Sequence, residues 1–191
     1  MDVGSSIRGS HVVNITPINR YSAKARHFHW TVAALVVLAY ALILSTDLFP
    51  RDTGIPDFLL QSHFWAGIGV LLLAIPRLIE RLRKSPPPVS PPLHPKLELL
   101  SRITHWALYA FLFAQPLLGI STVWLSDGAI PIPGTSLAVP SPFGVLPHVG
   151  HSLESIHKTL GTVFYYVIGL HIAAVVWHQF VRRDNLLKRM W

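Results

Sequence analysis

Eleven histidines stand in a chain of 191 residues, of which 51% are hydrophobic and only 13% are charged. Six of them lie within or at the edges of long apolar segments: His29, His63, His105, His157, His171 and His178. A polar side chain is costly to bury in a bilayer, so its presence there indicates a functional site. Neutral imidazole is also a good ligand for transition metals, including haem iron. The first hypothesis is therefore metal or cofactor binding inside a membrane.

The spacing of two of these histidines sharpens that hypothesis. Fourteen positions along the chain lead from His157 to His171. In an α-helix this returns to within about 40° of the same face and covers about 21 Å along the axis. Because the hydrocarbon core is about 30 Å thick, one helix face offers an imidazole near each boundary. Matching depths on other helices predict two six-coordinate irons, with the axial pairs His63 with His157, and His29 with His171.

Four uncharged segments of membrane length must position these side chains. Backbone groups in lipid have to be satisfied within the segment, so each one is predicted to be a helix. We expect an all-α, integral membrane four-helix bundle over residues 20–191, preceded by a flexible tail at 1–19. The uncharged segments are 28–46, 58–76, 103–126 and 159–181, and the expected helical spans around them are about 28–48, 60–82, 103–126 and 157–181. The link at 127–156, which is rich in Pro and Gly and carries little charge, is expected to fold as a cap, partly sunk in the interface.

The net charge of +7 reflects the placement of Lys and Arg. They gather before the first span, from Arg77 to Arg102 after the second uncharged segment, and after the fourth span. The other two links contain only Arg51 and Lys158. The positive-inside rule therefore predicts that both termini are cytoplasmic, and the charge indicates topology rather than nucleic-acid binding. The absence of cysteine excludes covalent haem attachment through C-x-x-C-H.

Other roles for the histidines have to be weighed. His105 and His178 could bond a haem propionate or a quinone oxygen, and plain interfacial histidines are equally expected. A proton or metal-ion pathway, as in a transporter, would need carboxylates beside the histidines, and the four uncharged segments contain none. Arg26, with the neighbouring Arg20 and Lys24, could pair with propionates at the cytoplasmic side or could serve topology alone. A quinone is expected near His105 or beneath the outer cap.

Several motifs resemble a known family. They are RYSAKARHFHW at the first span, SHFWAGIGVLLLAIPRLIERL at the second, HWALYAFLFAQPLLGIS at the third, and IHKTLGTVFYYVIGLH followed by DNLLKRM at the fourth. Over about residues 20–190 the chain is similar to bacterial cytochrome b561 proteins, within the wider group of di-haem cytochrome b subunits of nickel–iron hydrogenases and formate dehydrogenases. The resemblance implies four helices, two non-covalent haem b groups, and iron ligands at His29, His63, His157 and His171.

The resemblance also implies a function and a location. The family is found in the bacterial inner membrane with quinone as a redox partner, and small members oxidise superoxide and reduce ubiquinone. The outer links of this chain depart from that role, because they hold five acidic residues against two basic ones, and only Lys158 stands beside a predicted ligand. We therefore predict a di-haem electron carrier in the lipid bilayer, with periplasmic or membrane redox partners and no assigned catalytic residue. The alternative is a haem-bearing anchor subunit for a partner dehydrogenase or hydrogenase.

Overall fold

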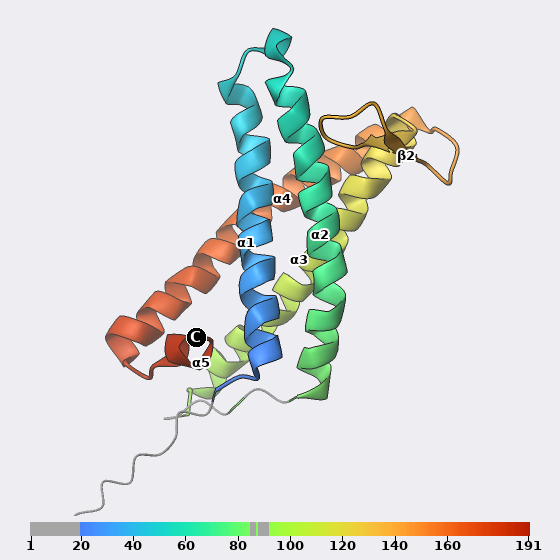
Figure 1. Cartoon of the computed structure of the whole chain (residues 1–191). Helices are drawn as coiled ribbons and strands as arrows, with labels where there is room; N and C mark the ends of the chain where they lie inside the picture. The colour runs from blue at the N-terminus through green and yellow to red at the C-terminus, as the bar shows by residue number, and fades with distance from the viewer. Residues whose placement is uncertain (1–19, 85–86, 88–91) are drawn as a thin grey trace, which may run out of the picture.

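Four long helices form the protein. The computed structural model describes residues 20–84, 87 and 92–191. The helices are α1 (Ala23–Ser45), α2 (Ile55–Arg83), α3 (Pro95–Ser126) and α4 (Pro147–Trp177) (Figure 1). Each is long and apolar enough to cross a membrane. The predicted all-α four-helix membrane bundle is confirmed. The tail predicted at 1–19 lies outside the described residues, and the cytoplasmic placement of the termini stays a prediction.

All four helices begin before the predicted spans. The third begins at Pro95 rather than near residue 103, and the fourth at Pro147 rather than at 157. Proline is favoured in the first turn of a helix because its fixed φ suits the helix and the missing N–H is not needed there. The apolar pattern predicts only the part of a helix that crosses lipid. The helix itself continues into the polar boundary because its backbone hydrogen bonds continue there. Both α2 and α3 run on through their internal prolines, Pro76 and Pro116.

The helices pack as two antiparallel hairpins. In Figure 1, α1 lies beside α2, while α3 and α4 cross behind them; α2 also contacts α3. The core cluster at mid-length consists of Val32, Val70, Ala74, Phe111 and Leu112. The ring of Phe111 stacks on that of Phe164 from α4, with ring centroids 4.0 Å apart. This aromatic stack joins the second hairpin at the middle of the bundle.

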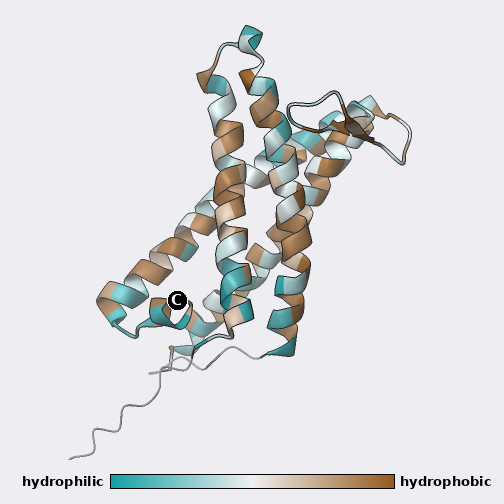
Figure 2. Ribbon diagram, viewed as in Figure 1, coloured by the Kyte–Doolittle hydropathy of each residue, from teal (hydrophilic) through white to brown (hydrophobic). Residues whose placement is uncertain are grey.

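Many large apolar side chains face outward. Leu72 is 62% exposed and Leu38 is 46% exposed, although both lie well inside their helices. Figure 2 shows apolar residues along the middle of α1 and α2, with hydrophilic residues towards the helix ends. Such a surface is unfavourable in water and suits a hydrocarbon environment. The distribution of hydropathy therefore agrees with four membrane-spanning helices.

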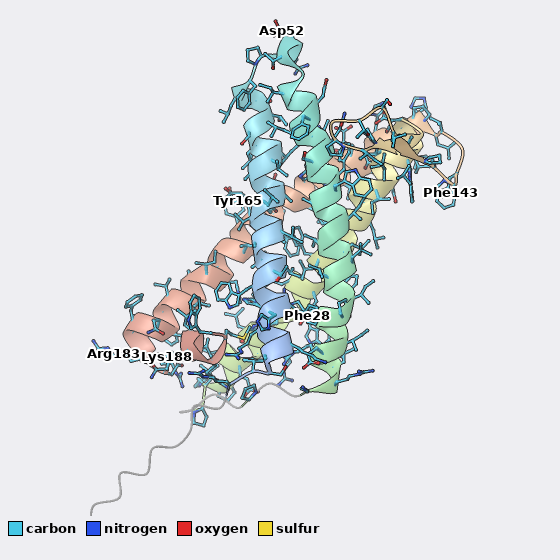
Figure 3. The ribbon with its side chains drawn as sticks, viewed as in Figure 1. Phe28, Asp52, Phe143, Tyr165, Arg183 and Lys188 are labelled. Carbon is cyan, nitrogen blue, oxygen red and sulfur yellow. The ribbon has the colours of Figure 1, made fainter. Side chains whose placement is uncertain are left out.

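One end of the bundle carries the α1–α2 turn and a small hairpin; we call it the outer end, after its predicted side. The turn contains the short helices η1 (Thr46–Leu48) and η2 (Arg51–Thr53), with Asp52 at its tip (Figure 3). The link predicted as a cap forms the antiparallel strands β1 (Ala129–Pro131) and β2 (Ala138–Pro140). Trp65 of α2 donates its indole N–H to the carbonyl of Pro131 at 2.9 Å, which fastens the hairpin to the bundle.

The opposite, inner end carries the start of α1 and the C-terminal segment, residues 183–191. The π-helical turn η3 (His178–Arg182) follows α4, and the short helix α5 (Leu186–Arg189) lies within the segment. The indole N–H of Trp30 donates to the carbonyl of Met190 at 2.7 Å, and the backbone N–H of Tyr21 donates to that of Arg189 at 3.1 Å. These bonds hold the end of the chain against the first helix.

Candidate functional site

The outer end brings one predicted histidine pair face to face. His63 lies in α2 and His157 in α4, with ring centroids 6.2 Å apart and ring planes at 84°. Imidazole nitrogen binds a transition metal at about 2 Å, so two imidazoles on opposite sides of one metal have centroids roughly 6 Å apart. The observed separation matches that of two axial ligands.

The backbone fixes which nitrogen each outer histidine can offer. Nδ1 of His63 bonds the carbonyl of Ala39 at 2.8 Å, and Nδ1 of His157 bonds the carbonyl of Gln115 at 3.1 Å. A carbonyl can only accept, so each Nδ1 carries the hydrogen and donates it. In neutral imidazole this leaves Nε2 with a free lone pair for a metal. Both outer histidines therefore have the tautomer that suits iron ligation through Nε2.

An apolar cavity adjoins the outer pair. It is lined by both histidines and by Phe64, Gly67, Ile68, Pro116, Gly119, Ile120, Val123 and Ile130. A Cβ atom at Gly119 would lie 3.2 Å from Cε1 of His157, so a side chain there would press on the imidazole. A Cβ atom at Gly67 would meet nothing within 4 Å. Gly67 thus leaves open space beside the cavity, while Gly119 lets the His157 ring lie close to α3. The lining is apolar, as that of a porphyrin site must be.

Two polar side chains that the sequence argument missed fix α4 around His157. Gln115 donates its side-chain amide to the carbonyl of His157 at 2.7 Å, while the His157 ring donates to the Gln115 carbonyl. Tyr40 of α1 donates its hydroxyl to the carbonyl of Gly161 at 2.8 Å. The available signal was a lone amide and a lone phenol in otherwise apolar spans. They hold the turn of α4 that carries His157 between two other helices.

The inner end gathers three histidines rather than two. His105 of α3 and His171 of α4 have ring centroids 5.6 Å apart, and His29 of α1 lies within electrostatic reach of both. Nδ1 of His105 donates to the carbonyl of Ser101 at 2.6 Å, so its Nε2 is also free of hydrogen. The pairing of His29 with His171 stays a prediction. His105, predicted to bond a propionate or a quinone oxygen, lies directly beside His171, one of the two predicted ligands.

Arg77 joins the inner histidines, although the sequence argument assigned it to the basic link. Its Nη2 donates to Nδ1 of His29 at 2.9 Å, and its guanidinium lies over the ring of Tyr109 at 5.4 Å from the centroid. Because a guanidinium can only donate, neutral His29 in this arrangement carries its hydrogen on Nε2. Ligation of iron through that nitrogen would require Arg77 to release Nδ1. Arg77 directly follows Pro76, and α2 continues through both residues. Its position at the end of an uncharged segment was the signal that its side chain could lie inside the bundle.

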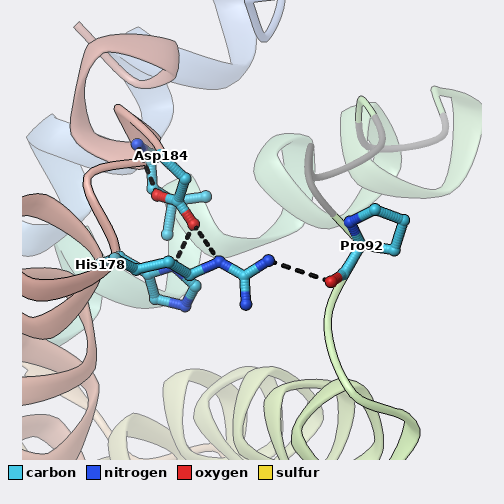
Figure 4. A network of polar contacts seen from close by, with 5 residues as sticks. Pro92, His178 and Asp184 are labelled. Atoms are coloured by element: carbon cyan, nitrogen blue, oxygen red, sulfur yellow. Dashed lines mark hydrogen bonds and ion pairs between the residues drawn. The ribbon is translucent and has the colours of Figure 1, made fainter.

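The other predicted contacts are engaged elsewhere in the chain. Nδ1 of His178 bonds Asp184 at 2.6 Å, in a network that also includes Arg182 (Figure 4). Arg26 donates to the carbonyl of Trp191. Lys158 has a side chain that is 72% exposed and pairs with Glu154 at 2.6 Å. The predicted roles of His178, Arg26 and Lys158 towards a cofactor stay predictions.

Comparison with known proteins identifies close relatives in sequence. The family model for prokaryotic cytochrome b561 matches residues 20–191. A probable superoxide oxidase, CybB, of Yersinia pestis is 31% identical over 179 residues, which cover 90% of this chain and 95% of that protein. Cytochrome b561 homolog 1 of Escherichia coli (strain K12) is 30% identical over 175 residues, which cover 91% and 97%. The resemblance predicted from the motifs is confirmed and includes all four long helices.

Proposed function

This chain belongs to the prokaryotic cytochrome b561 family, and we propose that it holds two haem b groups and conducts electrons between the two sides of the bacterial inner membrane. Family membership and the four apolar helices make it a multi-pass bacterial membrane protein and a b-type cytochrome of electron transfer. Beyond this, we propose the number of haems, their ligands, the quinone partner and the direction of electron transfer.

The outer histidine pair carries the proposal. His63 and His157 stand at the separation of two axial ligands, and both present a hydrogen-free Nε2. Bound haem b would supply reversible one-electron chemistry at its iron. The two imidazoles would occupy both axial positions, which favours electron transfer over oxygen binding. The carbonyls of Ala39 and Gln115 would hold the rings in orientation, as outer partners of metal-binding histidines do.

The inner set would hold the second haem through His171 and, as predicted, His29. His105 and Tyr109 add polar groups beside this site, and Trp106 packs its ring 5.9 Å from that of Tyr109. A quinone head group has two carbonyl oxygens that accept hydrogen bonds, so the hydroxyl of Tyr109 and the indole N–H of Trp106 are candidate donors to it. The hydrogen-free Nε2 of His105 would instead accept a hydrogen bond from a hydroxyl of the reduced quinol. Ubiquinone is the proposed acceptor because the family resemblance implies it.

Superoxide is the proposed donor, on the strength of the name of the Yersinia pestis relative. Each superoxide would lose one electron and leave as O₂; two such electrons and two protons would convert one ubiquinone to ubiquinol. The charges at the outer end do not attract this anionic donor. Five acidic residues outnumber two basic ones in the outer links, and Lys158 already pairs with Glu154. We therefore expect slow electrostatic capture of an anion.

A haem-bearing anchor subunit is the second candidate. Apolar side chains outside the spans favour it, because Leu137 is 65% exposed and Phe143 is 64% exposed on the outer cap. Exposed apolar residues of this kind can mark a protein contact. Copurification of a stoichiometric dehydrogenase subunit with the intact membrane protein would support the anchor role, whereas quinone reduction by the protein alone would support the independent role.

An absorption spectrum with haem quantified per chain tests the proposal. The purified protein should contain two haem b groups and show a b-type band on reduction. His157→Ala should lose the outer haem and His171→Ala the inner one, because each removes a single axial ligand. His148→Ala, at an exposed histidine at the start of α4, should keep both. A protein without a b-type band, or a His157→Ala variant that keeps both haems, would refute the proposal.

A further inference from the structure

Arg77 places a permanent charge among the inner histidines. Its side chain is partly buried within the bundle, bonds His29 at 2.9 Å and covers the ring of Tyr109. It also lies within electrostatic reach of His105 and His171. An arginine stays protonated in proteins, so this charge does not depend on pH.

Nothing among the described residues neutralises that charge by an ion pair. Glu80, one turn further along α2, bonds Ser22 at 2.6 Å and Lys84 at 3.0 Å instead. No described carboxylate lies within ion-pair distance of Arg77. A charge in these surroundings acts through a lower dielectric than a charge in water, so it acts more strongly on its neighbours.

The outer pair has no comparable charge. Among the described residues, no Lys, Arg, Asp or Glu lines the cavity beside His63 and His157. Lys158 follows His157 in sequence, but its side chain is largely exposed and is paired with Glu154. Water screens such an exposed pair, and the two charges oppose each other.

This asymmetry affects the redox potential. Oxidation of a haem iron from Fe(II) to Fe(III) adds one positive charge, and a nearby fixed cation makes that addition less favourable. We propose that Arg77 raises the midpoint potential of the inner haem above that of the outer haem, so that electrons run from the outer end to the inner end. In a protein that holds both haems, the group held by His63 and His157 would give up one electron, and the group held by His171 beside Arg77 would take it up. The proposal rests on the two-haem function, but the effect requires only that the inner iron lies near Arg77, whichever histidine pairs with His171.

The test is an optical redox titration of variants that hold a single haem. In a His63→Ala background, which keeps the inner haem, Arg77→Gln removes the charge and retains a hydrogen-bond donor for His29. We expect the Fe(III)/Fe(II) equilibrium to shift at least tenfold towards Fe(III), which is about 59 mV for a one-electron couple. Arg77→Lys should restore most of the potential because it restores the charge. Arg83→Gln, at an exposed arginine of the same helix, should leave the equilibrium within twofold of the background.

The unaltered arginine gives a second, independent test. The inner haem, isolated by His63→Ala, should have a higher midpoint potential than the outer haem, isolated by His171→Ala. The proposal is overturned if the outer haem has the higher potential, or if Arg77→Gln and Arg77→Lys give the same value. If neither background binds haem, the two-haem function fails rather than the role of Arg77.

Discussion

At the outer end two histidines face each other beside an apolar cavity, whereas at the inner end three histidines share their surroundings with Arg77 and Tyr109. The outer histidines receive their orientation from backbone carbonyls alone. The inner ones also meet a cation and a phenol. An apolar site with two fixed imidazoles can hold an iron and do little else, while the inner groups can also bind oxygen atoms or supply hydrogen bonds. We therefore propose that electrons enter at the outer end and that the polar groups of the inner end serve the exchange with quinone.

The largest effect should come from removing inner histidines one at a time. His29→Ala should eliminate the inner haem and leave one haem per chain, because it deletes a predicted axial ligand. His105→Ala should keep two haems and instead weaken the reaction with quinone. Haem quantification per chain and the KM for quinone provide the two measurements. If His105→Ala loses a haem and His29→Ala does not, then His105 is the ligand partner of His171.

The next effect concerns the C-terminal segment, which only the inner end possesses. The side chain of Asp184 is 1% exposed and pairs with His178 and Arg182 (Figure 4). Asp184→Ala removes a buried carboxylate that bonds both His178 and Arg182 and should lower the free energy of unfolding by about 3 kcal/mol. Thermal unfolding followed by the haem spectrum should show the inner haem released before the outer one.

Glu98→Ala is the matched control for this prediction. It breaks an exposed ion pair with Arg102 on α3, where both side chains are more than half exposed. Such pairs contribute about 0–1 kcal/mol, so the midpoint of thermal unfolding should barely move. Release of both haems together in Asp184→Ala would mean that the C-terminal segment supports the whole bundle rather than its inner end.

A smaller effect, confined to the outer end, should follow from filling the space beside His157. A Cβ atom added at Gly119 would lie 3.2 Å from Cε1 of that ring, and the rest of a larger side chain would come closer still. Overpacking of this kind costs about 1–3 kcal/mol, so Gly119→Val should weaken outer-haem binding roughly tenfold or more. Titration of haem into protein that carries His171→Ala isolates the outer site. Gly144→Val provides the control, because a Cβ atom there meets nothing within 4 Å; equal affinities in the two variants would contradict the close approach.

The features that the sequence predicted correctly are local ones. Uncharged runs of membrane length predicted the four helices, because burial in lipid requires both properties within one segment. Helical periodicity put His157 and His171 on one face of α4, and the structure brings His63 to the first of them. These inferences need only the geometry of a single helix and the thickness of the bilayer.

The features that the sequence missed depend on how distant helices pack. Arg77 reads as one more basic residue of a link until α2 is seen to continue past Pro76 and to face α1. The ring contact of His105 with His171 depends on the crossing of α3 and α4. The bond from Trp30 to Met190 joins residues 160 positions apart. The sequence pattern of a single helix cannot predict contacts with distant helices. Only the packing shows which polar side chains meet at the inner end.

The smallest effect should come from loosening the outer site without touching a ligand. Tyr40 donates its hydroxyl to the carbonyl of Gly161, four residues after His157 in α4. Tyr40→Phe removes that hydroxyl and keeps the ring, so the free energy of unfolding should fall by about 1 kcal/mol. Because α4 would lose a bond to α1 near the outer ligand, haem release on heating should shift at the outer site and remain unchanged at the inner one. An equal shift at both sites would mean that α4 moves as one rigid body. The two ends would then differ in their chemistry, but loosening one end would also loosen the other.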